Sequence, residues 1–360
     1  MHNELCELLD IDHPIIQAGM AGGSTTVDLV VSVSEAGGLG SLGAAYMSPK
    51  EIRLAIREIR SITDKPFAVN LFCTELKDNL DRVEQVQEVL NKMRNNLGLK
   101  PGIANISTKN LFKEQFQVLI EERVPVISTA FGSLPTEQLQ IAKDLGIKVI
   151  TMVTTVREAQ LVEEHGVDVI VAQGSEAGGH RGTFHVEPDS NGANIGLFSL
   201  IPQVVDAVSI PVVAAGGIMD ERGLVAALAL GAKGIQMGTI FLPTAESGAH
   251  DSYKEALLQS NEESTVLTKS FSGRPARGIK NKFIEEFENS GITPLAFPTQ
   301  NTVTGDIRKE ASKQNNVNFM SLWAGQGTRL LNKKLSAQEI IKQTINKSSH
   351  IIEHICKIKV

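Results

Sequence analysis

The stretch PVVAAGGIMDERGLVAALALGAKGIQMGTIF, residues 211–241, decides the fold. Residues 211–217 and 234–241 are apolar on both faces, as strands of a covered parallel sheet are. Residues 220–231, between them, have apolar positions at the spacing of a helix. Strand, helix and strand in succession form the repeat of a parallel α/β sheet.

The same repeat occurs along the rest of the chain. Further apolar runs that end in Gly or polar residues occupy 14–20, 39–44, 66–72, 124–131, 148–153 and 168–174. Segments of helical period lie at 25–37, 48–60, 134–146, 155–166 and 197–208. Eight strands alternating with helices predict a (β/α)8 barrel of the TIM type. An open doubly wound sheet shares the local pattern and is the alternative, but the count of eight favours the barrel.

Two regions do not fit the repeat. Residues 73–123 are polar and helical and longer than one crossover needs, and residues 243–334 follow the eighth strand with several loop signals. We therefore predict a barrel over 1–242 and a smaller, mainly helical cap over 243–334 that borders the substrate. Isoleucines at helical spacing predict that 335–360 is a C-terminal helix packing back on the barrel.

Composition excludes several classes of protein. The 360 residues are 42% apolar, enough to bury a large core, and the formal net charge is −6 without a strong cluster of Lys and Arg. This balance argues against nucleic acid or an anionic membrane as the partner. No apolar run approaches a membrane span, and the acidic start lacks a basic leader. The scattered Cys6, Cys73 and Cys356 indicate a reducing cytoplasm.

Glycines follow the seventh and eighth predicted strands. Gly216 and Gly217 precede a helix that starts near Asp220, and Gly238 and Thr239 end the next strand. Bare backbone N–H groups beside a helix N-terminus bind anions, and in these barrels the same two loops are the usual phosphate site. One such loop would be read as an ordinary tight connection, but two adjacent loops favour phosphate binding.

A second glycine motif points elsewhere. The segment GGLGSLGA contains GxGxxG at Gly38, Gly40 and Gly43. The dinucleotide fingerprint needs a strand, then the glycines, then a helix. Here a helix precedes the glycines and a strand runs through them. We therefore predict that these glycines let the helix and the strand pack closely.

The stretch VAQGSEAGGHRGTFH, residues 171–185, holds the candidate catalytic residue. His180 follows two glycines at the mouth of the sixth strand, the face on which these barrels place active sites. An ordinary imidazole pKa of about 6.5 suits a general base, whereas the plain alternative is a surface histidine. A metal site would pair His180 with His185, but no third ligand lies nearby and we predict no metal. Glu176 either caps a helix or orients a neighbour.

Several segments resemble the nitronate monooxygenases, formerly called 2-nitropropane dioxygenases. The match runs in order from about residue 14 to about residue 330. The matching segments are QAGMAGGST, AGGLGSLGA, VNLF, AQGSEAGGHRG, PVVAAGGIMDERG, GIQMGTIFL, FSGRPARGIKNKFI and SLWAGQG.

The resemblance implies an FMN-dependent barrel enzyme. Members oxidise alkyl nitronates, often propionate 3-nitronate, with O₂ to a carbonyl compound and nitrite. His180 matches the histidine proposed in the family as a base or as a positioner of the nitronate. By the same match, the residues implied to hold FMN are Asn70, Gln173, Gly178, Gly217, Gln236, Met237, Gly238 and Thr239. Asn70 would bond to the flavin ring, Gln173 and Gly178 would line the ring or the ribityl chain, and the last five would hold ribityl and phosphate.

The resemblance leaves alternatives open. Flavin-dependent enoyl-acyl-carrier-protein reductases share an EAGGH-like segment and take hydride from NADH or NADPH, and a non-catalytic flavin protein is a third reading. The residues HRG at 180–182, which complete the EAGGH-like segment and extend it, and the later segment SLWAGQG favour the monooxygenase. Arg181, Arg274 and Arg277 either bind a substrate carboxylate or form ion pairs that pin the cap to the barrel. The candidate aromatic residues besides Phe are Tyr46, Tyr253 and Trp323. The oligomeric state stays open.

Overall fold

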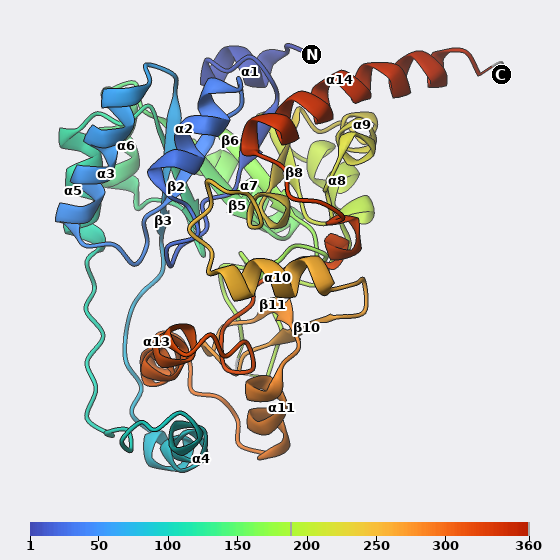
Figure 1. Ribbon diagram of the computed structural model, residues 1–360. Helices are drawn as coiled ribbons and strands as arrows, with labels where there is room; N and C mark the ends of the chain where they lie inside the picture. Colours follow the sequence, from blue (N-terminus) through green and yellow to red (C-terminus); the bar gives the residue numbers. More distant parts are fainter. Residues whose placement is uncertain (188, 359–360) are drawn as a thin grey trace.

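The computed structural model describes residues 1–187 and 189–358, so residue 188 of the predicted barrel and residues 359–360 of the predicted C-terminal segment lie outside the described residues. Eight parallel strands form one sheet in the order β1-β9-β8-β6-β5-β4-β3-β2 (Figure 1). A parallel bridge between Ile16 and Leu39 joins β1 to β2. The strands are β1 Ile15–Gln17, β2 Gly40–Gly43, β3 Phe67–Phe72, β4 Val126–Ala130, β5 Lys148–Val153, β6 Val169–Gln173, β8 Val212–Ala215 and β9 Gly234–Met237. The predicted (β/α)8 barrel is confirmed, and the open doubly wound sheet is excluded.

Helices cover the outside of the barrel. They are α2 Val27–Glu35, α3 Pro49–Ile62, α5 Phe112–Glu121, α6 Thr136–Asp144, α7 Val156–His165, α8 Leu197–Val205 and α9 Glu221–Ala229. α14 Ala337–Cys356 packs against α9 and α2 and fills the remaining gap in the ring. The local signals place these helices: at α3, Ser48 and Glu51 form a capping box and Pro49 holds the first helical position.

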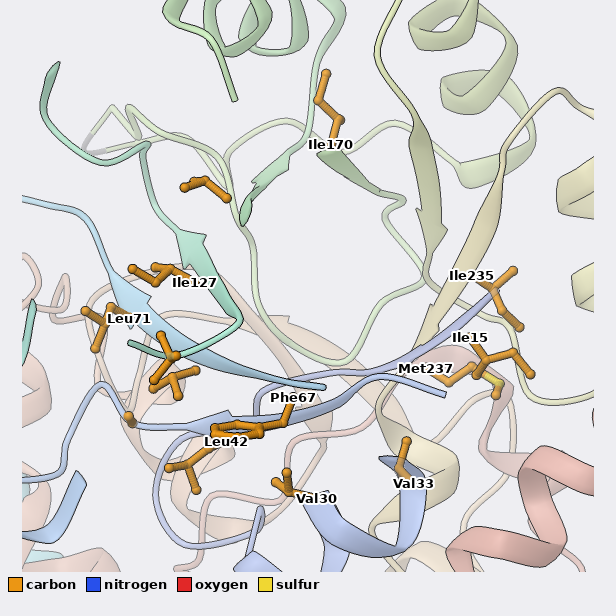
Figure 2. Packing of buried hydrophobic residues seen from close by; sticks show 14 of the residues in the cluster. Ile15, Val30, Val33, Leu42, Phe67, Leu71, Ile127, Ile170, Ile235 and Met237 are labelled. Carbon is orange, nitrogen blue, oxygen red and sulfur yellow. The ribbon is translucent and has the colours of Figure 1, made fainter. Parts of the chain in front are cut away.

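Successive side chains of each strand point alternately into two hydrophobic layers. Along β6, Val169 and Val171 face an inner cluster, whereas Ile170 and Ala172 face the helices. Figure 2 shows part of the outer layer, in which Ile15, Ile235 and Met237 lie side by side. Burial on both sides explains why the strands read as continuous apolar runs.

The amino-terminal end of the barrel is closed by a short helix. α1 Glu4–Leu9 places Leu5, Cys6 and Leu9 in the inner cluster, each at most 2% exposed. Space inside the barrel is therefore left at the opposite end, where the strands reach their carboxyl termini.

A second hydrophobic cluster lies beyond that end. It takes side chains from 243–334 and from α4 Val83–Asn96, which the chain reaches by two long connections out of the barrel (Figure 1). The buried Arg94 of α4 bonds to Asp306 at 2.7 Å and so ties α4 to this unit. Its other elements are α10 Asp251–Gln259, β10 Thr265–Thr268, β11 Ala276–Ile279, α11 Lys282–Asn289, α12 Thr299–Val303 and α13 Gly305–Lys313. Two 3-10 turns, η1 Thr239–Phe241 and η2 Gln326–Leu330, adjoin it.

The GxGxxG glycines pack a helix onto a strand, as predicted. Gly40 lies in β2, and a Cβ at this position would collide with the Val30 carbonyl of α2. The order is helix then strand, so these glycines form no dinucleotide turn. Separately, within the described residues no helix is long and apolar enough to cross a membrane.

Candidate active site

A cavity of about 820 Å³ lies between the carboxyl ends of the strands and the cap. The residues predicted from the sequence to hold the cofactor all line it, and so does His180, the predicted catalytic residue. They are Asn70, Gln173, Gly178, His180, Gly217, Gln236, Met237, Gly238 and Thr239. The structure therefore brings together residues from four separate parts of the chain, which gives one site for a cofactor and a substrate.

Polar side chains at inward strand positions form the cavity floor. Asn70 lies in the inward row of β3, and its Nδ2 donates to Ser128 Oγ of β4 at 3.0 Å. Gln236 occupies the inward position of β9 next to outward-facing Met237. The Met237 side chain packs in the outer layer and is 1% exposed, so it is not free to reach into the cavity.

The two glycine loops supply free backbone donors. Among the described residues, no acceptor is found for the N–H groups of Gly217, Gly238 and Thr239. The Thr239 hydroxyl accepts from Gly325 N at 3.0 Å, so a loop of the cap lies against this wall. Unpaired N–H groups that face one cavity fit the phosphate of the expected FMN.

Gly178 is needed for close packing of two loops. A Cβ at Gly178 would approach Gly325 N to 2.5 Å. The loop that carries His180 and the cap segment SLWAGQG thus meet backbone to backbone. This contact explains why both segments are glycine-rich.

Hydrogen bonds fix the His180 loop from two sides. Gln173 Nε2 donates to His180 O at 3.0 Å, and Gln173 Oε1 accepts from Gly182 N at 2.8 Å. β7 Gly179–His180 also pairs with β11 of the cap, with His180 opposite Ala276. The Gln173 amide, implied by the resemblance to face the flavin, is therefore engaged in holding the loop.

The His180 imidazole is partly buried between aromatic rings. Its centroid lies 5.8 Å from Phe131 and 5.2 Å from Trp323. Its Nε2 lies 2.9 Å from Ser272 Oγ, and that hydroxyl donates to Arg274 O at 3.0 Å. Ser272 therefore accepts from Nε2–H, which leaves Nδ1 with a free lone pair.

Burial lowers the pKa of His180 from 6.5 to about 3, and the positive charges of Arg274 and Arg308 act in the same direction. This differs from the ordinary pKa assumed from the sequence. His180 is neutral at physiological pH. Since the unfolded chain takes up this proton near pH 6.5 and the folded chain only near pH 3, protonation disfavours the fold as the pH falls through that window.

We expect the His180 ring to stay neutral and protonated on Nε2 from pH 8 down to pH 5. Long-range ¹H–¹⁵N spectra of the imidazole nitrogens measure this directly. The His180→Asn variant assigns the resonance, because only its signal disappears. A midpoint between pH 6 and 7 would show that the ring is solvated instead of buried.

The three arginines proposed as substrate or ion-pair partners do neither. None lines the cavity, and in the part of the chain described none of them forms an ion pair. Arg181 donates to Gly174 O at 2.6 Å, Arg277 to Ser175 O at 3.0 Å and Arg274 to Thr183 O. All three satisfy carbonyls of the His180 loop, and two of them thereby join it to the cap.

Glu176 and His185 have structural roles outside the chemistry of the site. Both carboxylate oxygens of Glu176 accept from Leu197 N, at 2.9 and 3.0 Å. Glu176 therefore caps α8, which is one of the two roles predicted for it from the sequence. On the surface, His185 Nε2 lies 2.9 Å from Glu187 Oε1, whereas His180 Nε2 hydrogen-bonds with Ser272 Oγ. The two histidines therefore do not converge.

The cap contributes residues that sequence reasoning missed. Arg308, Lys309 and Lys313 of α13 line the cavity. Tyr46, Tyr253 and Trp323, the three aromatic candidates, also lie on its wall, and the Tyr253 hydroxyl donates to Trp323 O. The α13 residues give no local signal, because a polar helix rich in Lys and Arg reads as a solvated surface.

Comparison with known proteins gives one family. The profile described as "Nitronate monooxygenase" matches residues 2–347. A "Probable nitronate monooxygenase" of Staphylococcus saprophyticus is 43% identical over 346 residues, covering 96% of this chain and 97% of that protein. A nitroalkane oxidase from Streptomyces ansochromogenes superposes with a TM-score of 0.91 at 37% identity, covering 98% and 99% of the two chains. FabK from Thermotoga maritima follows at a TM-score of 0.78 and 31% identity, covering 99% and 98%.

Proposed function

The chain belongs to the nitronate monooxygenase family, and from this premise we propose that it oxidises alkyl nitronates, among them propionate 3-nitronate, with O₂ to a carbonyl compound and nitrite. The observation that carries the proposal is one cavity bordered by His180, by both glycine loops and by three cationic side chains. The match to FabK is weaker in both identity and superposition than the match to the nitroalkane oxidase, so the reductase reading is not favoured.

FMN is the cofactor of the family, and the cavity wall fits it. The N–H groups of Gly217, Gly238 and Thr239 would bind the phosphate, and Gln236 would bond to the ribityl chain. Asn70 would contact the flavin ring, with Gly178 on the wall beside it. When bound, FMN supplies the electron transfer from the nitronate and on to O₂. Met237 would contribute through its main chain, since its side chain packs outward.

We assign His180 the position next to the nitro group. Its free Nδ1 can take a proton from the carbon of a neutral nitroalkane, whereas a preformed nitronate needs no base. Gln173 keeps the histidine in place by bonding to its backbone on one side and to Gly182 on the other. Phe131 and Trp323 exclude water from the ring.

We further propose roles for the larger parts of the chain. Residues 1–242, apart from α4, would serve as the cofactor-binding barrel, and 243–334 with α4 as a cap over the substrate. Residues 335–358 would stabilise the barrel through α14. Cys6, Cys73 and Cys356 are free thiols, which suits the cytoplasm.

The direct test is aerobic turnover of an alkyl nitronate. We expect O₂ consumption and nitrite release without NADH, because the nitronate itself supplies the electrons. Oxygen-electrode traces and a colorimetric nitrite assay measure the two. In an anaerobic control, NADH alone should leave the flavin absorbance unchanged. No nitrite above a buffer blank across several nitronates, with rapid bleaching by NADH, would reverse the assignment in favour of a reductase.

A further inference from the structure

A hydroxyl of the cap contacts the imidazole of the barrel. Ser272 lies in the turn between β10 and β11, whereas His180 lies on the loop that follows β6. Ser272 is 1% exposed, and its Oγ lies 2.9 Å from His180 Nε2. In the part of the chain that the structure describes, this is the one hydrogen bond of the imidazole ring. The cap therefore supplies the polar contact that orients the ring.

The turn that carries this hydroxyl is fixed on both sides. Gly273 N donates to Lys269 O at 2.8 Å, and Gln300 Nε2 donates to Ser270 O at 2.7 Å. The pairing of β7 with β11 holds the backbone of His180 against the same part of the cap. The hydroxyl and the imidazole are thus both attached to backbone that cannot shift independently.

The hydrogen bonds of the Ser272 hydroxyl determine which way its proton points. A hydroxyl has one proton to donate and two lone pairs. Ser272 Oγ donates to Arg274 O at 3.0 Å, and no other group of the described chain donates to that carbonyl. Arg274 is 7% exposed, so its carbonyl needs a donor from the protein. Arg274 N donates back to Oγ at 3.2 Å, which leaves one lone pair for His180. Nε2 must therefore carry a proton and donate it.

The other ring nitrogen, Nδ1, is the one that a substrate can reach. It has no hydrogen-bond partner among the described residues, and it remains accessible from the cavity that the ring lines. When Nδ1 takes a proton from carbon, the N–H bond forms and the electron pair of the broken C–H bond stays on the substrate as the nitronate. The ring is then an imidazolium, and its Nε2–H bond to Ser272 becomes charge-assisted and stronger. The contact thus stabilises the charged ring more than the neutral one.

We propose that Ser272 is a positioning residue for proton abstraction: the cap hydroxyl holds His180 in the Nε2–H form, so that Nδ1 acts as the base where cap and barrel meet. The inference rests on the proposed function, because it concerns the proton step of the same reaction. It assigns to the cap a part in the chemistry, besides enclosing the substrate. A serine that only closed its own turn would affect nitroalkane and nitronate alike, which the kinetics distinguish.

The experiment compares kcat/KM for neutral 1-nitropropane with kcat/KM for preformed propyl 1-nitronate. Ser272→Ala should lower the first by about 10- to 100-fold, the usual cost of losing a charge-assisted hydrogen bond. It should lower the second by only about 2- to 3-fold, the low end for a neutral hydrogen bond, because the nitronate needs no base. Ser270→Ala is the matched control. Ser270 is equally buried in the same turn and accepts from Thr268 Oγ1, yet it has no hydrogen bond to His180, so both rates should stay near those of the wild type.

The tautomer of His180 is a second readout, which needs no turnover. Long-range ¹H–¹⁵N spectra should show the Nε2–H form alone in the wild type and in Ser270→Ala, and a mixture with the Nδ1–H form in Ser272→Ala. If the wild type gives no nitrite from either substrate, the proposed function fails, yet the spectra still decide whether Ser272 sets the tautomer. An Nδ1–H ring in the wild type, or an Nε2–H ring alone in Ser272→Ala, would overturn the proposal. So would equal losses on both substrates in Ser272→Ala, or a wild type that oxidises the nitronate but not the nitroalkane.

Discussion

Replacement of His180 by asparagine is expected to lower kcat/KM for a neutral nitroalkane by about 10²- to 10⁴-fold, the usual loss when a general base is removed. The low pKa of His180 does not prevent the ring from acting as a base toward the bound nitroalkane. The proton leaves carbon to give a nitronate anion, and the imidazolium forms beside that anion. Their attraction offsets part of the cost of charging a buried ring.

The measurement is the ratio of kcat/KM on nitroalkane to kcat/KM on the preformed nitronate, in wild type and variant. The nitronate needs no base, so its rate should fall only as far as a lost positioning contact requires, by about 10-fold. A steep fall in the ratio supports the base role. If both rates drop by the same factor, His180 orients the anion and does not take a proton; if neither changes, it is not part of the active site.

The barrel was predictable because its strands are buried on both sides. Each strand reads as an apolar run, and the outer helices show apolar positions at helical spacing, several of them with a capping residue at the N-terminus. The glycine loops could be located for a related reason. In a parallel barrel, all strand carboxyl ends meet at one face, so loops distant in sequence converge there.

Short antiparallel elements were missed. β7 is two residues long, and β10 and β11 carry Thr, Arg and Gly instead of a continuous apolar run. Their pairing fixes His180, yet it depends on a contact between residues 180 and 276 that no local pattern reports. The roles of Arg181, Arg274 and Arg277 were misjudged for the same reason. Their partners are backbone carbonyls, and because every residue has one, the sequence does not indicate which carbonyl a side chain will bond to.

The substrate side of the cavity was the least predictable part. α4 precedes the fourth strand in sequence but packs with residues near 303–311, because its apolar face finds the second cluster and not the barrel. Arg308 and Tyr46 are separated by most of the chain, and both line the cavity because α13 docks over the barrel mouth. Tertiary packing, and not local propensity, assembles this wall.

Replacement of Gly217 by aspartate is expected to weaken FMN binding by about 100-fold or more and to yield folded, colourless protein. Gly217 lines the cavity and offers a free N–H in the first glycine loop. A carboxylate there would repel the phosphate: two unit charges about 6 Å apart interact by about 3 kcal/mol at an effective dielectric of about 20. A phosphate carries more than one negative charge at neutral pH, which enlarges the effect.

Gly217→Asn is the matched control, because it separates charge from backbone strain and bulk. Gly217 has φ = 67°, and a Cβ would lie 3.3 Å from Glu176 Cβ, so both variants meet the same crowding. Asn and Asp tolerate this left-handed conformation better than most residues, and the two differ only in charge. The flavin absorbance per protein and the Kd for FMN added to stripped protein measure the outcome, with circular dichroism confirming the fold. If the aspartate variant binds FMN as tightly as the asparagine variant, the phosphate lies elsewhere than beside this loop.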